Sequence, residues 1–469
     1  MQLSINKKDK IHLIGVGGIG MSGIALILKK MGYEVQGSDI SKNNKNLSSL
    51  RKNKIKIFGI HKAANVDKAK IVVISTAIDK KNNELEAALK KKILVIKRAD
   101  MLAHIISLKK NIVISGSHGK TTITSLVSTI LNDAKFKPTI VNGGIINSLK
   151  TNASLGEGEW SVIEADESDG SFLKFNNTIA IVSNIDREHM DYYKNFSSLI
   201  NQFKLFLNKT PFFGKNIVCL DDANIKKIIK ESPKKNFLTY GFNPKSDFIP
   251  INIIYENMKI YFDLNVNIKK NFVIKKIELN LMGRHNVLNA TAAIIAAISL
   301  GISIKKIKHT LKNFLGVQRR LTKVYESKRR IIFDDYAHHP TEIEAVLSAC
   351  KNSFKGKKII SVFQPHRFSR VESLYKEFTG CFSKSDLVIL CPVYAAGEKN
   401  INFNIEQFGK KIIKNSKTEV VIIKDEENLN VFLNKNFAMN ELIIAMGAGN
   451  ISQWIRSISK KLINDKIKY

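Results

Sequence analysis

The chain has 469 residues, of which 44% are hydrophobic, so it can build several buried cores, and its length is typical of about three domains. Its four cysteines are scattered without paired spacing, which argues against a structural zinc site and suits the reducing cytoplasm. The formal net charge is +34, but the lysines are spread along the whole length. We interpret the charge as a compositional bias toward Lys, Ile and Asn and expect no nucleic-acid or membrane partner. A basic nucleic-acid-binding ATPase remains an alternative.

The first long apolar segment, residues 12–28, follows three lysines and resembles a signal peptide or a short membrane span. It contains five glycines and is shorter than an ordinary span, so it predicts a strand at 11–14, a tight turn and a helix from about residue 21. Further strands are expected at 34–37, 54–58, 71–74 and 93–96. Strands alternating with helices predict a Rossmann-like domain with a parallel sheet over residues 1–108.

The turn after the first strand has the pattern G-x-G-x-x-G, formed by Gly15, Gly17, Gly18 and Gly20, and Asp39 ends the next strand. Such a turn lets the backbone approach a diphosphate, and the carboxylate can bind a ribose or a base. A UDP-linked substrate satisfies this pattern as well as NAD does. An NAD-dependent oxidoreductase therefore remains an alternative.

A second glycine-rich turn separates an apolar strand at 112–114 from an amphipathic helix at 123–131. It comprises Gly116, Ser117, His118, Gly119, Lys120, Thr121 and Thr122. Backbone N–H groups at a helix N-terminus attract phosphate, Lys120 can reach terminal phosphates and Thr121 can bind Mg²⁺. Ile114 stands where a full Walker A motif has its first glycine, and a chance surface turn is the alternative. We predict a P-loop ATPase domain with a mainly parallel sheet over residues 109–321.

Acidic residues follow the next two strands of this domain. Four of them, within residues 164–169, come directly after a strand at 160–165, and they repel one another unless a cation such as Mg²⁺ neutralises them; a solvated acidic turn is the alternative. His189 follows a strand at 178–184 and could bind a second Mg²⁺, although Mg²⁺ prefers oxygen. Residues 243–277 are expected to form hairpins or loops. Asn286 and Asn289 begin an Ala-rich helix and could either bind adenine or, for Asn286, cap the helix.

The last part of the chain, residues 322–469, predicts a second Rossmann-like domain. Strands are expected at 330–334, 358–363, 386–391, 419–423 and 441–445, with helices at 341–354, 371–382 and 451–462. Polar residues follow the first two of these strands, where open α/β sheets bind ligands. Arg367 and Arg370 could hold a carboxylate bidentately or be ordinary surface arginines. Six of the ten histidines fall in polar turns and suggest a shared site, namely His118, His189, His285, His338, His339 and His366.

Taken together, these segments resemble the Mur ligase family over essentially the whole chain. The resemblance rests on HLIGVGGIGMSG, SGSHGKTT, EADESDGSF, NIDREHMDYY, GRHNVLNA, GVQRR, DDYAHHPTE and FQPHRFSR, which occur in the family's order. It implies three domains, the last closing over ATP, and ATP- and Mg²⁺-dependent joining of L-alanine to UDP-N-acetylmuramate through an acyl phosphate. Joining of a preformed tripeptide to the same sugar nucleotide is the nearest alternative. We also allow for a homodimer.

The resemblance implies a role for individual residues. The phosphate turn from Gly116 to Thr122 would bind ATP, with Lys120 on the β- and γ-phosphates, Thr121 and Glu164 on a first metal and His189 on a metal near the carboxylate. Asn286 and Asn289 would contact adenine, and Arg320 and Asp335 phosphate and ribose. The alanine end and the reacting centre would use Tyr336, His338, His366, Arg367 and Arg370. The uridine diphosphate would lie against Gly15 to Gly20, Asp39, Ser75 and Thr76.

Three departures from the family pattern bear on these roles. Ser117 replaces the usual Thr, and Asp186-Arg187-Glu188 replaces a Glu-x-Asp pattern with acidity kept at both ends. Ile60 separates Gly59 from His61, where the family has adjacent Gly and His, so no substrate role is carried over to His61.

Overall fold

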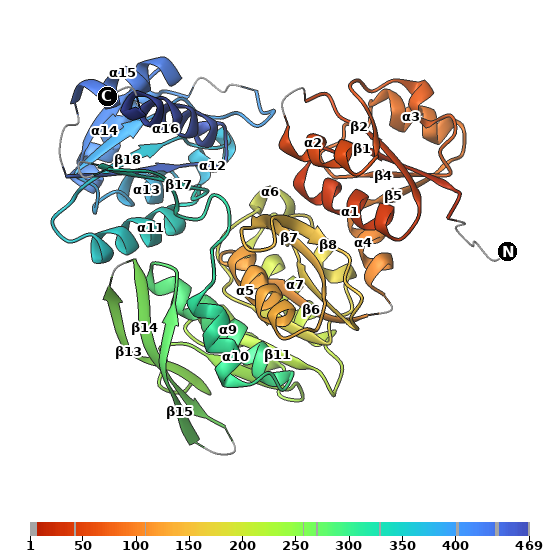
Figure 1. Ribbon diagram of the computed structural model, residues 1–469, viewed down its shortest axis with the longest axis horizontal. Helices are drawn as coiled ribbons and strands as arrows, with labels where there is room; N and C mark the ends of the chain where they lie inside the picture. The colour runs from red at the N-terminus through yellow and green to blue at the C-terminus, as the bar shows by residue number, and fades with distance from the viewer. Residues whose placement is uncertain are drawn as a thin grey trace. The chain divides into compact units, whose positions relative to one another are not determined.

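The computed structural model describes residues 7–41, 44–107, 109–256, 258–268, 271–327, 330–399, 403–436 and 440–467. The described strands form three sheets, one in each predicted domain (Figure 1). The chain divides into two compact units. Unit 1 comprises Met1–Ile251, Asp263–Ile277 and Leu288–Leu315, and unit 2 comprises Asn252–Phe262, Glu278–Val287 and Gly316–Tyr469. Among the described residues, no helix has both the length and the apolar character needed to cross a bilayer.

The N-terminal sheet has five parallel strands in the order β3-β2-β1-β4-β5. They are β1 (Lys10–Ile14), β2 (Glu34–Ser38), β3 (Lys56–Phe58), β4 (Ile71–Ile74) and β5 (Leu94–Lys97), with helices α1 (Ile19–Lys30), α2 (Lys45–Lys52), α3 (Asn83–Lys90) and α4 (Arg98–Ile106). The predicted strands are confirmed, with β3 shorter because Lys54 adopts a positive φ of 59°. The helix after the glycine turn begins at Ile19 rather than Met21, because Gly18 already caps it through a 2.8 Å bond from the Ser22 N–H.

The central sheet has ten strands in the order β15-β14-β13-β12-β11-β10-β6-β9-β7-β8. Its strands are β6 (Lys110–Ser115), β7 (Thr139–Ile146), β8 (Thr151–Ser154), β9 (Trp160–Glu164), β10 (Ile179–Val182), β11 (Lys215–Cys219), β12 (Phe237–Tyr240), β13 (Phe248–Glu256), β14 (Lys259–Asn267) and β15 (Asn271–Leu279). The pairs among β6, β7, β9, β10, β11 and β12 are parallel, whereas β8 runs antiparallel to β7. The mainly parallel sheet is confirmed, and the segment at 243–277 forms long strands.

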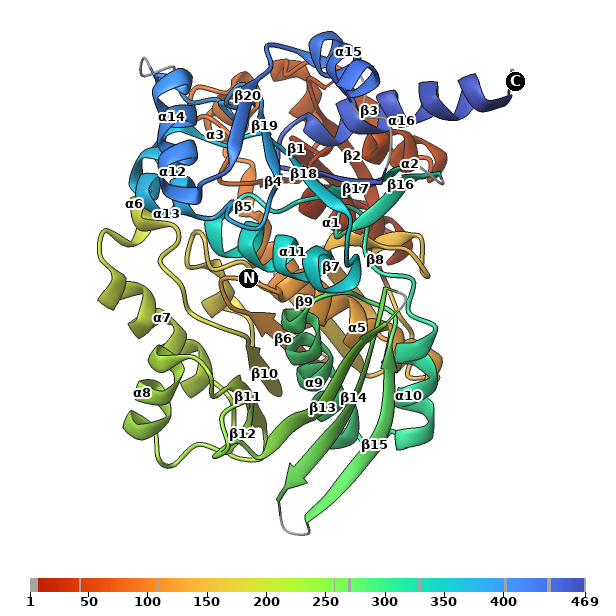
Figure 2. The ribbon, with the colours of Figure 1, turned by 90° about the vertical axis from the view of Figure 1, so that its left-hand side faces the viewer.

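The helices of this central part are α5 (Lys120–Asp133), α6 (Met190–Tyr193), α7 (Phe196–Asn208), α8 (Ala223–Glu231), α9 (Arg284–Ser299) and α10 (Ile304–Lys312), with a short 3-10 turn, η2 (Ser171–Lys174). Helix α5 follows β6 directly and is buried on all sides from Thr121 to Leu131, which explains its run of small and apolar residues. Helices α7 and α8 lie beside β10 to β12 (Figure 2). The loop between α7 and β11 leads into that strand and so lies at its amino-terminal end.

The C-terminal sheet has six strands in the order β16-β17-β21-β18-β19-β20. They are β16 (Thr322–Glu326), β17 (Arg330–Asp335), β18 (Lys358–Phe363), β19 (Leu387–Leu390), β20 (Glu419–Ile422) and β21 (Glu441–Met446), and all but β16 run parallel. The helices are α11 (Pro340–Ser353), α12 (Phe368–Ser373), α13 (Tyr375–Gly380), α14 (Ile405–Ser416), α15 (Glu426–Asn436) and α16 (Ile451–Ile467). The predicted single helix at 371–382 is wrong, because Leu374 leaves the helical conformation and divides α12 from α13.

Candidate nucleotide and substrate sites

The phosphate turn connects β6 to α5 and requires glycine at two positions. Gly116 has a φ of +128° and Gly119 a φ of +86°, a region that side chains with a Cβ rarely adopt. A Cβ on Gly116 would also meet the Ser183 hydroxyl and come within 3.1 Å of the Asn184 carbonyl oxygen. The turn is therefore packed tightly against the end of β10.

Hydrogen bonds to the segment after β10 fix this turn. The His118 N–H donates to Asn184 Oδ1 at 2.8 Å, and the Ser117 N–H donates to the Asn184 carbonyl at 3.0 Å. The Ser117 hydroxyl accepts from the Asp186 N–H at 2.8 Å, and His118 Nε2 lies 3.1 Å from Asp186 Oδ2. Ser117, the mild departure from the family pattern, thus has a clear structural partner.

Lys120 points its ammonium into the turn. Its Nζ donates to the carbonyl of Gly116 at 2.6 Å, to that of Ser117 at 3.1 Å and to Glu167 Oε1 at 3.0 Å. Burial lowers the pKa of Lys120, but the carboxylates of Glu167, Asp166 and Glu188 outweigh burial and raise it above its ordinary value. The turn therefore holds a permanent positive charge at the position where a P-loop binds phosphate.

Thr121 and Glu164 lie together at the start of α5. Thr121 Oγ1 donates to Glu164 Oε1 at 2.9 Å, and Glu164 Oε2 accepts from the Gly143 N–H at 2.6 Å. A Cβ on Gly143 would come within 2.6 Å of the same carboxylate. A hydroxyl and a carboxylate in contact beside a phosphate turn are the oxygen ligands that Mg²⁺ prefers, so these two residues fit a magnesium ion.

His189 lies with a different carboxylate set. One ligand atom each from Asp166, Glu167 and His189 lie within 4.8 Å of one another, and His189 Nε2 is 3.7 Å from Glu167 Oε1. His189 has a left-handed conformation with φ of +57°, which places it at the start of α6. Burial, reinforced by Asp166 and Glu188, raises the pKa of Glu167. The sequence indicated this acidic run, but it did not single out Glu167, the one fully buried carboxylate among them.

The two asparagines expected at adenine lie on α9 in different surroundings. Asn289 Oδ1 would meet a Cβ built on Gly119 at 2.6 Å, so this side chain contacts the phosphate turn. Asn286 Nδ2 donates to the Met282 carbonyl at 2.7 Å, one turn earlier. Asn286 thus ties the start of α9 to the preceding turn by donating to a carbonyl. Thr122 is buried within α5.

The N-terminal glycine turn is held by Asp39. Gly15 has a φ of +73°, and the Gly17 N–H donates to Asp39 Oδ2 at 2.8 Å. Asn44 and Asn46 both donate their side-chain amides to the Gly17 carbonyl, at 3.0 and 2.8 Å. Gly18 caps α1 and Gly20 lies in its first turn. The carboxylate of Asp39 therefore supports the turn itself, and the ribose contact implied by the resemblance stays a prediction.

Ser75 and Thr76 follow β4, which pairs with β1 in parallel. Their position after the strand places them at the same carboxyl edge of the sheet as Gly15. Ser75 is half-buried and Thr76 is exposed. The structure thus brings the predicted uridine diphosphate residues to one edge.

A buried polar network that the sequence analysis missed lies under this edge. Glu84 is fully buried and accepts from Ser38 Oγ at 2.5 Å and from Asn65 Nδ2 at 2.5 Å. Its Oε2 lies 3.0 Å from His61 Nδ1 and 3.4 Å from Nε2 of the fully buried His12. Burial raises the pKa of Glu84, but hydrogen bonds from His12, Ser38 and Asn65 lower it overall. His61, set aside in the sequence, thus has a buried carboxylate as its partner.

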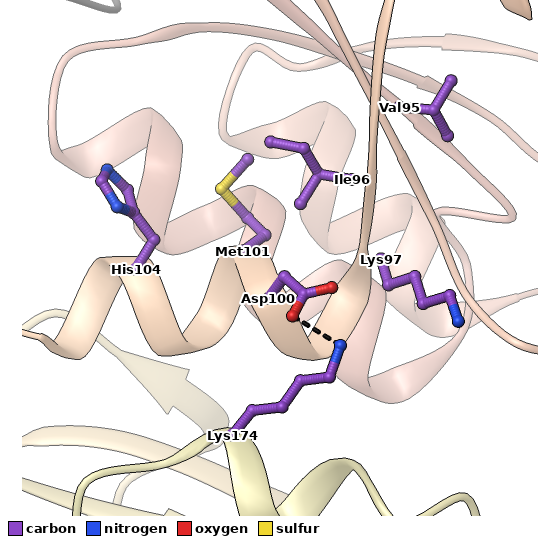
Figure 3. A pocket seen from close by; sticks show the side chains of 7 residues that line it. All are labelled: Val95, Ile96, Lys97, Asp100, Met101, His104 and Lys174. Atoms are coloured by element: carbon purple, nitrogen blue, oxygen red, sulfur yellow. Dashed lines mark hydrogen bonds and ion pairs between the residues drawn. The ribbon is translucent and has the colours of Figure 1, made fainter. Parts of the chain in front are cut away.

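Figure 3 shows a separate open pocket of about 660 Å³ at the end of β5. Its lining is Val95, Ile96, Lys97, Asp100, Met101, His104 and Lys174. Lys174 Nζ of η2 pairs with Asp100 Oδ1 of α4 at 2.5 Å, which satisfies both charges. None of the residues predicted for ATP, metal or substrate lines this pocket.

In unit 2, the predicted residues Tyr336, His338, His366 and Arg370 form one cluster at the ends of β17 and β18. The rings of Tyr336 and His338 lie 5.2 Å apart and those of His338 and His366 lie 6.0 Å apart, both edge to face. Arg370 Nη1 is 3.4 Å from His366 Nδ1. Burial, together with His338, Arg370 and Arg367, lowers the pKa of His366 to about 3. His366 is therefore neutral near pH 7.

Two members of this cluster were not predicted. Tyr394 stacks on His366 with ring centroids 5.5 Å apart and an interplanar angle of 12°. Glu342 of α11 accepts from the His338 N–H at 3.1 Å, and its Oε1 lies 3.8 Å from Arg320 Nη1. Tyr394 is distant from His366 in the sequence, and Glu342 lies one helical turn after His338. The sequence alone does not show that either side chain contacts this cluster.

Arg320, Asp335 and Arg367 are placed around this cluster by the backbone. Arg320 lies over the Tyr336 ring at 5.5 Å. Asp335 accepts from the N–H groups of Leu321 at 2.6 Å and Ala337 at 2.7 Å, and burial raises its pKa although Arg320 opposes this. Arg367 has a positive φ of 67° and donates its N–H to the Tyr394 carbonyl at 2.8 Å. Such a strained conformation at a ligand edge is typical of a binding position.

Comparison with protein-family models accounts for nearly the whole chain. Residues 10–110 match the Mur ligase family catalytic domain, residues 114–297 the Mur ligase middle domain and residues 319–449 the Mur ligase glutamate ligase domain. The chain belongs to the Mur ligase family. The resemblance and the three-domain α/β fold are thereby confirmed, and the alternative of an NAD-dependent oxidoreductase is not supported.

Individual relatives agree with this assignment. A protein of Pelagibacter ubique named UDP-N-acetylmuramate–L-alanine ligase is 48% identical over 461 residues, covering 98% of this chain and 99% of the relative. A protein of the same name from Agrobacterium fabrum is 42% identical and covers 96% of each chain. The crystal structure of UDP-N-acetylmuramate-alanine ligase from Thermotoga maritima matches with a TM-score of 0.84 and 26% identity, covering 97% of this chain and 99% of that one. A murein peptide ligase from Psychrobacter arcticus shares the fold, with a TM-score of 0.73.

Proposed function

We propose that this Mur ligase joins L-alanine to the lactyl carboxylate of UDP-N-acetylmuramate at the expense of ATP, in cytoplasmic peptidoglycan precursor synthesis. The observation that carries the proposal is full-length identity of 48% to a relative of that name, together with the Lys120, Thr121 and Glu164 arrangement at the phosphate turn. Residues 1–108 would bind the UDP substrate, residues 109–321 ATP, and residues 322–469 would bind the amino acid and close over ATP.

The reaction has two steps. A carboxylate oxygen of the sugar attacks the γ-phosphorus of ATP, and the bond from that phosphorus to the β–γ bridging oxygen breaks. ADP departs, and the sugar then carries an acyl phosphate. The amine of L-alanine then attacks the acyl carbon, and phosphate leaves with its bonding electrons to give an amide. Such phosphoryl transfer depends mainly on positioning and charge neutralisation.

Residues of unit 1 would serve the first step. N–H groups of the phosphate turn and the Lys120 ammonium would bind the β- and γ-phosphates and stabilise the charge that develops between them. Thr121 and Glu164 would hold one Mg²⁺ and His189, with Asp166 and Glu167, a second. Bound Mg²⁺ neutralises phosphate charge in this chemistry.

Residues of unit 2 would serve the second step. Arg367 and Arg370 would bind the carboxylate of alanine, and the neutral His366, held by Tyr394 and Arg370, would orient the amine without adding charge. His338 and Tyr336 complete this cluster, and Arg320 and Asp335 would contact phosphate and ribose. The two arginines of this cluster thus favour an amino acid with a free carboxylate.

The test measures phosphate release from ATP and Mg²⁺ with UDP-N-acetylmuramate, scanning single amino acids and the cell-wall tripeptide. Release that requires both the sugar nucleotide and L-alanine supports the proposal. Release with the tripeptide alone would instead assign the chain to peptide recycling on the same sugar nucleotide. No release with any acceptor would contradict both.

A further inference from the structure

Two phenylalanines stand out at the loop between α7 and β11. Phe212 is 94% exposed and Phe213 is 66% exposed, and their rings lie edge to face with centroids 5.3 Å apart. Large aromatic side chains this exposed are unusual on a soluble surface, and here they are adjacent. Neither has a place in the proposed reaction.

The loop that carries them is firmly braced. The Gly214 N–H donates to the Pro211 carbonyl at 2.9 Å, and Thr210 Oγ1 donates to Asn216 Oδ1 at 2.7 Å while accepting from Asn177 Nδ2 at 3.0 Å. A Cβ on Gly214 would collide with the Thr178 carbonyl. The two rings are therefore presented by a fixed turn, and ordering them on a partner costs little further backbone entropy.

Lysines supply the charge of this loop and of the loop beside it. Lys235 donates its ammonium to the Asn208 carbonyl at 2.5 Å and to the Thr210 carbonyl at 2.8 Å, which places the loop at 232–236 against the Phe loop. The two loops, 209–215 and 232–236, contain no Asp or Glu in their sequence. We call Phe212, Phe213, Lys209, Lys215, Lys234 and Lys235 the Phe–Lys patch.

The patch lies at the opposite edge of the sheet from the nucleotide. It precedes β11, whereas the phosphate turn follows β6, and β6, β10 and β11 run parallel. A partner on the patch would leave the phosphate turn open. Ligation and docking are therefore separable.

We propose that the Phe–Lys patch docks the protein reversibly on an anionic lipid bilayer. Aromatic side chains insert at the interface of a bilayer, and lysines beside them are attracted to anionic headgroups. The two exposed rings at the tip of a turn offer insertion rather than a groove in which bases could stack. A second copy is a poorer partner, since it brings the same lysines and a net charge of +34. This proposal departs from the expectation of no membrane partner, which the spread of the lysines along the chain favoured.

The experiment measures co-sedimentation of the full chain with vesicles. One set of vesicles is pure phosphatidylcholine, and the other also contains about 30 mol% phosphatidylglycerol, roughly the anionic content of natural membranes. We expect binding to the anionic vesicles only, weakened by salt. The double substitution Phe212→Ser with Phe213→Ser should weaken it about tenfold or more, and Lys234→Gln about fivefold. The matched control is Leu89→Ser, which removes a leucine that is 58% exposed on α3 and should leave binding unchanged.

Phosphate release and the thermal midpoint should be the same in all these variants, so vesicle binding is read independently of the proposed reaction. No binding to anionic vesicles, or binding that the double substitution leaves intact, would overturn the proposal. Two other outcomes would also overturn it if vesicle binding is absent. One is a dimer that depends on the two phenylalanines, and the other is binding to a single-stranded oligonucleotide that depends on them. Sedimentation velocity and fluorescence anisotropy measure these two outcomes.

Discussion

The Lys120 ammonium lies 2.9 Å from the Glu167 carboxylate, and the two side chains are only 14% and 0% exposed. A cation and an anion this deeply buried depend on each other, because neither is stabilised by bulk water. The same ammonium bonds the carbonyls of the phosphate turn. Lys120 thus links the acidic cluster to the nucleotide site.

Replacing Lys120 with Ala should lower ligation by about a thousandfold or more, because the positive charge beside the transferred phosphate is lost. The fold should persist at neutral pH, since Glu167, whose pKa burial already raises, can take up a proton. Initial-rate phosphate release measures the first effect and circular dichroism the second. Near-normal turnover in this variant would remove Lys120 from the phosphate site.

The same variant should have a stability that depends on pH. A buried carboxyl with a raised pKa binds a proton more readily in the folded than in the unfolded state, so the folded state is favoured at low pH and loses that advantage as pH rises. The free energy of unfolding of Lys120→Ala should therefore fall as the pH rises above about 4.5, the ordinary pKa of the carboxyl. Urea unfolding at several pH values measures it, and a free energy of unfolding that stays constant between about pH 5 and about pH 8 would contradict the raised pKa of Glu167.

Gly116→Ala should disable nucleotide binding. It combines a left-handed conformation that costs roughly 1–2 kcal/mol with a Cβ that collides with Ser183. Gly356→Ala is the matched control, since Gly356 also has a positive φ, of 78°, but no atom within 4 Å of the added Cβ. Isothermal titration with ATP and Mg²⁺ should show at least about a tenfold loss for the first variant only. An affinity for ATP equal to that of the natural protein would mean that the turn adjusts to the added methyl group without weakening phosphate binding.

Arg370→Ala should raise the KM for L-alanine by about tenfold with a smaller effect on kcat, because a charged hydrogen bond to the substrate carboxylate is lost. Lys376→Ala removes an exposed cation a few residues along and serves as the control. Steady-state kinetics with varied alanine separates the two constants. An unchanged KM would show that Arg370 supports His366 without touching the amino acid.

Glu84→Gln should destabilise the N-terminal domain by about 2 kcal/mol, because the amide group that replaces one carboxylate oxygen cannot accept the buried hydrogen bond from Ser38 or Asn65. The pKa of Glu84 is lowered in the fold, so its contribution is present above its ordinary pKa and is lost as the pH falls below about 4.5. Glu86→Gln, on the exposed face of the same helix, should change stability by less than about 0.5 kcal/mol. Thermal unfolding at pH 7 compares the pair, and matching midpoints would contradict the role of Glu84.

The sequence predicted those elements whose signal is local. Runs of β-branched residues such as those of β1, β6 and β21 are buried on both faces of parallel sheets, and glycine turns after strands follow from backbone geometry alone. It missed β7, β8, β11, β12 and β16, which are short or mix polar and apolar residues. It also missed α7, α8, α10, α14 and α15, which are amphipathic but interrupted by polar residues.

The candidate site shows the same division. The phosphate turn and the strand-end histidines were visible as spacing in the chain. Glu167, Glu84 and Tyr394 were not, because each is defined by a contact with a residue from a different element, Lys120, His12 and His366 respectively. Which carboxylate of the run at 164–169 faces the lysine depends on how the strand end turns, and this is a property of the fold.

Asp335 has one further consequence, for movement of the chain. Asp335 accepts N–H bonds from both Leu321 and Ala337, and the Tyr336 N–H donates to the Arg319 carbonyl at 2.8 Å. These bonds attach the segment around Arg320 to the C-terminal domain, so the two should move together. A hinge between this domain and the central one is therefore expected before Arg320, where Gly316 has a positive φ of 76°. Arg320 would then travel with Tyr336 and Glu342 as one piece, so lengthening the chain before Gly316 should spare their geometry, whereas an insertion after Arg320 should destroy it.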